Sequence, residues 1–554
     1  MYSKKPMLMW LLLSLTVNTW AGEKEELLKL RNTTTNLIQM LVKQGVLSEE
    51  NATHMIKQAE ADAEQQVKAA QQAEKLEPGE VRVTYVPEYV KDEIRRQVRE
   101  ELRQDVVGDV MAQAKQEQWG VPDALPEWTQ RFKFSGDMRL RFESDRMADS
   151  NIAGSHFDWQ HINEVGGLSK AGESAFLNTT KDRNRYRARV RLGINAKVTT
   201  GLKAGLRIST GNLDNPVSTN QTLGNRNNRW DLVLDRAFLE YKGQDSDAYN
   251  WLVLSGGRIK NPWFSSDLVW DKDLGFEGVA GKFRYNLAGS GSLDDISDDS
   301  RTLFVTAGAF PLQESELSNN DQWLFGGQVG VDWIFDNQDN LKVGVAYYDY
   351  YNIEARPNTQ IPDTCDLNRP VNDASIPEFI QKGNSLAQIC REGSATNPGD
   401  FPGKVGLAGD YNILNFTAVY DIARFSPYHI ILTADYAKNL GFNHDEILAR
   451  TGNDITEQTD AWQFKVQYGW PRADYPGRWN VYTAYKYLER DAVLDAFTDS
   501  DFHLGGTNAK GWIVGGRYGI MDGSWLSARW MSADEIDGPP LGIDVLQVDL
   551  NARF

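Results

Sequence analysis

Hydrophobic and polar residues alternate one by one along most of the chain after residue 130. The segment 183–195, RNRYRARVRLGIN, is the plainest example, with arginine at every second position up to 191 and increasingly apolar residues between them. Alternation with a period of two sends the two sets of side chains to opposite faces of a β-strand. Such a strand either covers the core of a soluble sandwich or turns its apolar face to lipid and its charged face to a water-filled lumen.

The same alternation recurs in sixteen segments and predicts an all-β domain over 127–554. Tryptophan, tyrosine and phenylalanine are frequent on the apolar side, for example in 322–335 and 460–470. Apolar residues facing lipid and aromatic rings at the membrane interfaces are typical of transmembrane antiparallel strands. The predicted strands span 131–144, 184–198, 203–210, 234–242, 250–260, 276–287, 302–311, 322–335, 341–352, 411–421, 428–438, 460–470, 478–488, 510–519, 524–532 and 544–554.

The connections between these strands alternate between long and short. Segments such as 145–183, 353–410 and 489–509 are long, whereas TTGL and MDG are tight turns. Outer-membrane barrels have short periplasmic turns and long external loops. A closed transmembrane antiparallel β-barrel of about 16 strands leaves no unpaired edge and encloses an aqueous channel. The segment 289–301 is the exception, because it is long for a periplasmic turn.

The first 21 residues have the pattern of a secretory signal peptide. Lys4 and Lys5 precede an apolar run over 7–17, and small residues stand at 19 and 21. The run is shorter than the roughly 20 residues that a transmembrane helix needs, which disfavours an uncleaved anchor. We expect cleavage after Ala21 and export to the outer membrane of a Gram-negative cell.

Residues 22–126 differ from the rest in being rich in Glu, Gln, Lys and Ala. Val90, Ile94, Val98 and Leu102 form an apolar stripe at helical spacing, which predicts an α-helical or coiled-coil segment. With an even number of strands, this segment lies in the periplasm. It either self-associates, contacts peptidoglycan or another periplasmic partner, or acts as a solvated spacer.

The last strand ends the chain on an aromatic residue. In DVLQVDLNARF, residues 544–554, alternate positions are apolar up to Phe554. The segment resembles the closing strand of bacterial outer-membrane proteins, which ends in an aromatic residue read by the barrel-assembly machinery. The resemblance therefore implies that machinery as a partner and Phe554 as the signal.

Composition narrows the classes of function. The chain has 47 glycines, 17 tryptophans and 21 tyrosines, which suits many strands and turns. Its net charge of −18 argues against a general nucleic-acid binder, because a phosphate partner needs a basic surface. Phosphate-binding glycine loops, CxxC motifs and serine-triad patterns are absent from the sequence, so no catalytic residue and no cofactor is expected.

The chain as a whole resembles the bacterial putative-porin family of outer-membrane channels. The resemblance rests on the signal peptide, the helical segment, the barrel ending in Phe554 and the stretch GGRIKNPWFSSDLVWDKDLGFEG, 256–278, which is similar to the family's signature region. It implies passive diffusion of small hydrophilic solutes, contact with outer-membrane lipid and, as in many porins, a homotrimer. It does not assign a solute.

In a barrel, the arginines of segment 183–191 would lie on the face opposite the lipid, which lines the lumen. Basic residues on this predicted wall would favour small anions and offer them successive weak sites. The candidate pore-lining basic residues are Arg131, Lys133, Arg139, Arg141, Arg185, Arg187, Arg189, Arg191, Lys203, Arg207, Arg236 and Arg258.

Carboxylates could cancel the electric field of these basic residues. Asp267, Asp271 and Asp273 lie in a connection that resembles the constriction loop of general porins, which folds into the lumen. The sequence leaves three alternatives open: a transverse field of opposed charges, a net anion-preferring ladder, or arginines that are purely structural.

Cys365 and Cys390 both lie in the longest predicted external loop. Two cysteines in an oxidising compartment predict one disulfide. Metal binding is the weaker alternative, because no second cysteine pair or histidine set lies nearby, and no metal site is expected.

Two other functions compete with a porin. The long loops and the helical segment suit an adhesin or an anchor that links the envelope. A membrane-embedded hydrolase would need a nucleophile or an acid pair at one rim, which the alternation does not single out.

Overall fold

The computed structural model describes residues 131–245, 249–287, 301–316, 319–358, 363–365, 372–394 and 397–554. The chain divides into two units, Met1–Gly120 and Val121–Phe554, and all described residues belong to the second. The predicted signal peptide and the whole predicted helical segment, 22–126, thus lie outside the described residues, and so does most of the unusual connection 289–301.

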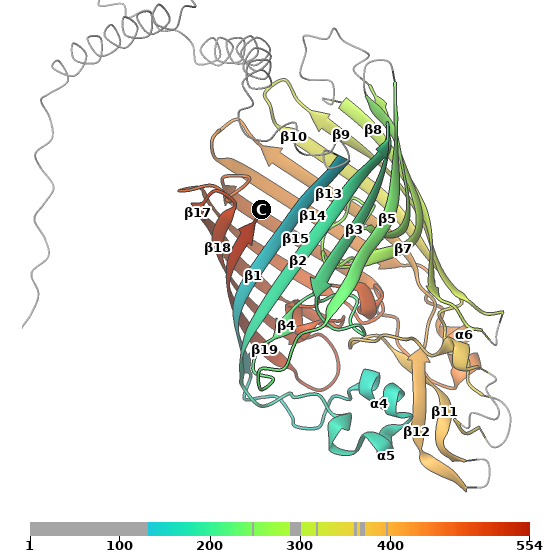
Figure 1. The fold of residues 1–554 in the computed structure, drawn as a ribbon. Helices are drawn as coiled ribbons and strands as arrows, with labels where there is room; N and C mark the ends of the chain where they lie inside the picture. The colour runs from blue at the N-terminus through green and yellow to red at the C-terminus, as the bar shows by residue number, and fades with distance from the viewer. Residues whose placement is uncertain are drawn as a thin grey trace, which may run out of the picture. The chain divides into compact units, whose positions relative to one another are not determined.

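Sixteen antiparallel strands form a closed barrel, which confirms the predicted fold (Figure 1). Each strand pairs with the next along the chain, and the last pairs with the first. The strands are β1 (Phe132–Met147), β2 (Arg183–Thr199), β3 (Leu202–Thr210), β5 (Leu232–Gln244), β6 (Asn250–Lys260), β7 (Gly275–Asn286), β8 (Arg301–Gln313), β9 (Gln322–Ile334), β10 (Asn340–Tyr351), β13 (Asn412–Ile422), β14 (His429–Asn439), β15 (Asp460–Gly469), β16 (Trp479–Leu488), β17 (Ala509–Met521), β18 (Ser524–Glu535) and β19 (Gly542–Arg553).

The barrel closes where the end of the chain meets β1. Arg139 lies opposite Asn551 on β19, and the ladder continues to the last residues. The Gly136 N–H donates to the Phe554 carbonyl at 2.8 Å, and the Phe554 N–H donates back at 3.0 Å. The terminal residue therefore completes the seam between the first and last strands.

Outward positions are apolar and exposed along the wall. On β2, Tyr186 is 61% exposed and Leu192 43%, whereas the arginines between them are more covered. On the wall formed by β15–β17, Trp462, Tyr485 and Trp512 lie in ring contact. An exposed apolar and aromatic surface is what a barrel presents to lipid.

The two ends of the barrel differ. The turn end holds tight connections such as 335–339 and 423–428. At the other end, here called the loop end, the connections carry small elements of their own, which the sequence did not predict (Figure 1). These are α4 (Trp159–Val165), α5 (Leu168–Ala171), η2 (Gly172–Ala175), β4 (Gln221–Thr222), η3 (Asp373–Ser375), β11 (Leu386–Ser394), β12 (Asn397–Leu407), α6 (His444–Thr451), η4 (Asp495–Phe497) and η5 (Phe502–Leu504). Within the described residues, no helix has the length and apolar character needed to cross a membrane.

An apolar core fills part of the barrel interior. Trp270, from the connection between β6 and β7, packs edge-on against Phe276 on β7 and Tyr348 on β10. Both strand residues occupy inward positions and are almost fully buried. A cavity of about 850 Å³ lies beside these rings and is lined by Trp270, Phe276 and Phe310 among others.

Candidate pore and its constriction

The arginines of β2 stand on the inner face of the barrel. Arg185, Arg187, Arg189 and Arg191 alternate with the exposed outer residues of the strand. Register places Arg187 opposite Arg141 and Arg189 opposite Arg139 on β1. The strand alternation therefore brings six guanidinium groups together on one wall.

Carboxylates on β1 pair with most of this row. Glu143 bonds Arg185 and lies 3.3 Å from the Arg187 Nη1. Asp137 accepts hydrogen bonds from Arg189 and Arg191, both at 2.8 Å. Strand β1 thus supplies counter-charges directly opposite the row on β2.

Neighbouring strands extend the same pairing. The Arg141 Nε donates to Asp549 on β19 at 2.7 Å, and Lys203 on β3 lies 2.8 Å from Glu240. Arg207 pairs with Asp235 on β5. Most of the basic wall is therefore charge-matched.

Five predicted lumenal residues behave differently. Arg139 and Arg236 have no carboxylate within 4.0 Å in the part of the chain that the structure describes. Arg131 and Lys133 are exposed at the start of β1. Arg258 pairs with Glu277.

Arg258 departs from the expected row because of its place on β6. Register sets it beside Glu277 on β7, while their neighbours Ile259 and Phe276 are buried in the interior core. Arg258 and Glu277 line the cavity beside Trp270 and Phe276 and pair with each other there, so Arg258 lies apart from the arginine row on β2.

The predicted constriction loop, 261–274, enters the lumen. Asp273 lies 3.0 Å from Arg191 and 3.5 Å from Arg189, and it is almost fully buried. Asp267 lies 3.5 Å from Lys486 on β16, at the other side of the barrel. Ion pairs at both sides thus hold the loop across the interior.

A second loop, 489–508, also enters the lumen, which the sequence did not predict. Asp501 lies 3.0 Å from Arg141 and 2.6 Å from Arg529 on β18. Asp499 lies 3.4 Å from Lys486. The only sequence signal was the acidic segment DSD, 499–501, in a long connection.

Asp271 joins the two loops. Its backbone N–H donates to the Phe497 carbonyl at 2.7 Å, and its carboxylate accepts hydrogen bonds from the Ser500 N–H at 3.0 Å and Oγ at 3.1 Å. Burial raises the pKa of Asp271 to about 7, with Asp499 and Asp273 also raising it and Lys272 opposing the shift. The joint between the loops therefore rests on a carboxyl that titrates near neutrality.

A cavity of about 420 Å³ lies on the loop-end side of the constriction. Its lining includes Arg185, Arg187, Glu143, Ser218 and Asp501. Charges of both signs thus face the same space, and a solute that passed along the arginine row would meet them.

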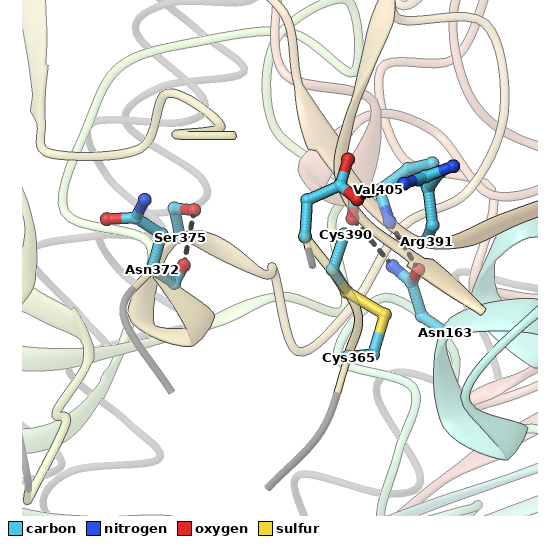
Figure 2. Close-up of a disulfide and its surroundings, with 8 residues drawn as sticks. Asn163, Cys365, Asn372, Ser375, Cys390, Arg391 and Val405 are labelled. Carbon is cyan, nitrogen blue, oxygen red and sulfur yellow. Dashed lines mark hydrogen bonds and ion pairs between the residues drawn. A yellow bond between two sulfur atoms is a disulfide. The ribbon is translucent and has the colours of Figure 1, made fainter. Parts of the chain in front are cut away.

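The longest connection, residues 352–411 between β10 and β13, is here called the cap. A disulfide joins two of its segments (Figure 2). Cys365 and Cys390 are bonded, with Cα atoms 5.1 Å apart. The side chain of Asn163 on α4 makes two hydrogen bonds of 2.9 Å with the backbone of Val405 on β12. Elements from two loops are thereby tied together at the loop end. The described residues contain no group of three or more His, Cys, Asp or Glu side chains placed to hold a metal ion.

A closed sixteen-strand barrel, narrowed by inward loops that bear charges of both signs, defines a porin-type channel. The family described as putative porin matches residues 31–554. The chain belongs to this family and is an outer-membrane channel protein.

Three solved structures match most of the chain at low sequence identity. OprB of Pseudomonas putida at high pH has 12% sequence identity and a TM-score of 0.42, and the match covers 77% of this chain and 95% of that chain. The outer-membrane channel DcaP of Acinetobacter baumannii has 12% identity and a TM-score of 0.36, with 77% and 98% covered. OmpF of Salmonella typhi, in complex with daunomycin, has 10% identity and a TM-score of 0.36, with 76% and 97% covered. No curated protein sequence matches the chain.

Proposed function

We propose that the protein is a passive outer-membrane channel for small hydrophilic solutes, with a mild preference for anions. The observation that carries the proposal is the lumen wall of β1–β3, where a dense row of arginines is mostly, but not completely, matched by carboxylates. Six of its eight inward arginines have a carboxylate within 4.0 Å, namely Arg141, Arg185, Arg187, Arg189, Arg191 and Arg207. Arg139 and Arg183 have none among the described residues.

Paired charges favour mild selectivity. A guanidinium beside a carboxylate contributes little net field at the distance of a passing ion, whereas the transverse arrangement of the two signs orients dipolar solutes. The surplus of positive charge on the wall lowers the energy of anions relative to cations. A steep anion ladder would need arginines without counter-charges.

Several further features belong to the same proposal. The loop end faces the outside and the turn end the periplasm, where the helical segment 22–126 also lies. Phe554, at the seam with β1, acts as the signal for the barrel-assembly machinery. The channel assembles as a homotrimer within the membrane.

Liposome swelling and planar-bilayer recordings test the proposal together. Refolded full-length protein should admit small uncharged sugars and acetate, and it should conduct in KCl with a reversal potential slightly on the chloride side. Protein unfolded before reconstitution is the control. Folded protein that neither conducts nor admits these solutes would remove the channel and favour an anchoring role for the barrel.

A further inference from the structure

Arg139 is the one buried inward arginine of β1–β3 that has no carboxylate within 4.0 Å among the described residues. Arg183, at the start of β2, also has none there, but it is exposed. Arg139 is only 5% exposed, and its Nε has no hydrogen-bond partner. The amide oxygen of Asn220 accepts a hydrogen bond from its Nη2. Arg139 is therefore a buried cation whose described hydrogen-bond partner is a neutral group.

The nearby carboxylates form ion pairs with other arginines. Asp137, two residues before Arg139, bonds Arg189 and Arg191. Asp549 binds Arg141 through both oxygens, at 2.7 and 2.9 Å. Asp273 and Asp501, whose charges also act on Arg139, pair with Arg191 and with Arg141 and Arg529 respectively. None of these four carboxylates is within 4.0 Å of Arg139.

The positive charge around Arg139 is reinforced by its neighbours. Arg189 lies directly opposite it on β2, and Arg141 follows two residues later on the same face of β1. On the other side, β19 contributes Asn551, which is neutral. A guanidinium does not deprotonate in proteins, so Arg139 stays positively charged.

A buried charge without a partner is costly, and an external counter-ion removes that cost. Arg236 also lacks a carboxylate, but it is half-buried, so water can solvate it. A bound anion would therefore stabilise the protein most at Arg139.

We propose that Arg139, through the N–H groups that do not donate to Asn220, binds one small anion taken from the lumen. The ligand class is a halide or a compact inorganic oxyanion such as phosphate, because a guanidinium offers up to five N–H donors in a planar fork. This inference rests on the proposed function, since an open lumen is the route by which the anion arrives. It names the residue at which the mild anion preference is localised.

The test is the anion-dependent rise in the unfolding temperature of the refolded full chain in detergent. Phosphate and chloride are titrated separately into a gluconate background at constant ionic strength, which separates the two sources of the anion. The variants are Arg139→Gln and Asn220→Asp, and Arg146→Gln is the matched control. Arg146 is an exposed arginine near the end of β1, 3.0 Å from Asp182 and away from the row.

The wild type and Arg146→Gln should show the same saturable rise. In Arg139→Gln the half-saturating concentration should increase about ten-fold, because one charge-assisted interaction is lost. Asn220→Asp supplies the missing carboxylate within the chain, so it should be more stable without added anion and should not respond to phosphate or chloride. This variant keeps the test decisive even if Arg139→Gln does not refold.

A wild type without a saturable rise, or an Asn220→Asp variant that responds as the wild type does, overturns the site. Conductance of the same preparations separates this result from the channel proposal. Conduction without an anion response leaves the channel standing and removes the site. An anion response without conduction supports the site and contradicts the channel.

Discussion

Replacing Glu143 by glutamine should raise the anion preference of the channel. Glu143 is 1% exposed and is the only described carboxylate within 4.0 Å of Arg187. It is shared with Arg185, which keeps Asp145 at 3.0 Å, and it accepts a hydrogen bond of 3.0 Å from Gln547. The substitution removes one negative charge while keeping the shape and an acceptor oxygen.

The size of the effect follows from the position of the charge. At about 10 Å in a water-filled lumen, one elementary charge changes the energy of a passing ion by about 0.4 kcal/mol, with opposite signs for chloride and potassium. The chloride-to-potassium permeability ratio should therefore rise about four-fold. Leaving Arg187 without its carboxylate should lower the free energy of unfolding by about 2 kcal/mol.

Reversal potentials under a KCl gradient measure the permeability ratio. Salt near 10 mM on the dilute side keeps the Debye length at about 30 Å, so the charge is not screened. Asp182→Asn is the matched control, since it removes the same charge from an exposed carboxylate at the loop end. A folded Glu143→Gln variant with the reversal potential of the wild type would refute the view that lumenal carboxylates set the selectivity.

Three further changes have expected outcomes. Replacing Cys365 and Cys390 by serine frees a chain segment with a sequence separation of 25, so it should cost the cap about 3 kcal/mol and expose it to protease, while the heat-modifiable band of the barrel stays unchanged. Because the pKa of Asp271 is raised in the folded protein, the protonated carboxyl stabilises the fold at low pH, and this stabilisation is lost as pH rises from about 4 to about 7. The unfolding temperature of the wild type relative to Asp271→Asn should therefore fall over this range. A constant difference between the two would contradict the assignment. Gly136→Val should displace the ring of Phe554, because a Cβ at Gly136 would come within 2.5 Å of it, and slower conversion to the folded band on refolding gels would show this.

The strands could be predicted from the sequence because their environment imposes a pattern on it. Lipid on one side and water on the other force strict alternation, as on β9 and β15, and all sixteen predicted strands are present. The loop-end elements have no such constraint. The helix α6 and the β11–β12 hairpin pack on other loops rather than on lipid or lumen, so their patterns are short and irregular.

The arginines of the candidate site could be predicted from the sequence, but their ion-pair partners could not. Alternation on β1 and β2 predicted the arginines on one face, and register sets Arg187 opposite Arg141 and Arg189 opposite Arg139. Their partners depend on tertiary contacts: Asp501 reaches Arg141 from a loop 360 residues away in sequence. Arg258 lies apart from the row because it pairs with Glu277 on β7, beside the interior core that contains Ile259.

The most direct test of a basic wall balanced by carboxylates is the reversal potential of a variant with Arg185, Arg187 and Arg189 replaced by alanine. The wild type should prefer chloride slightly. The variant should prefer potassium, because Glu143 and its neighbouring carboxylates would lose their partners. A wild type with strong cation preference, or a folded variant with an unchanged reversal potential, would contradict the account.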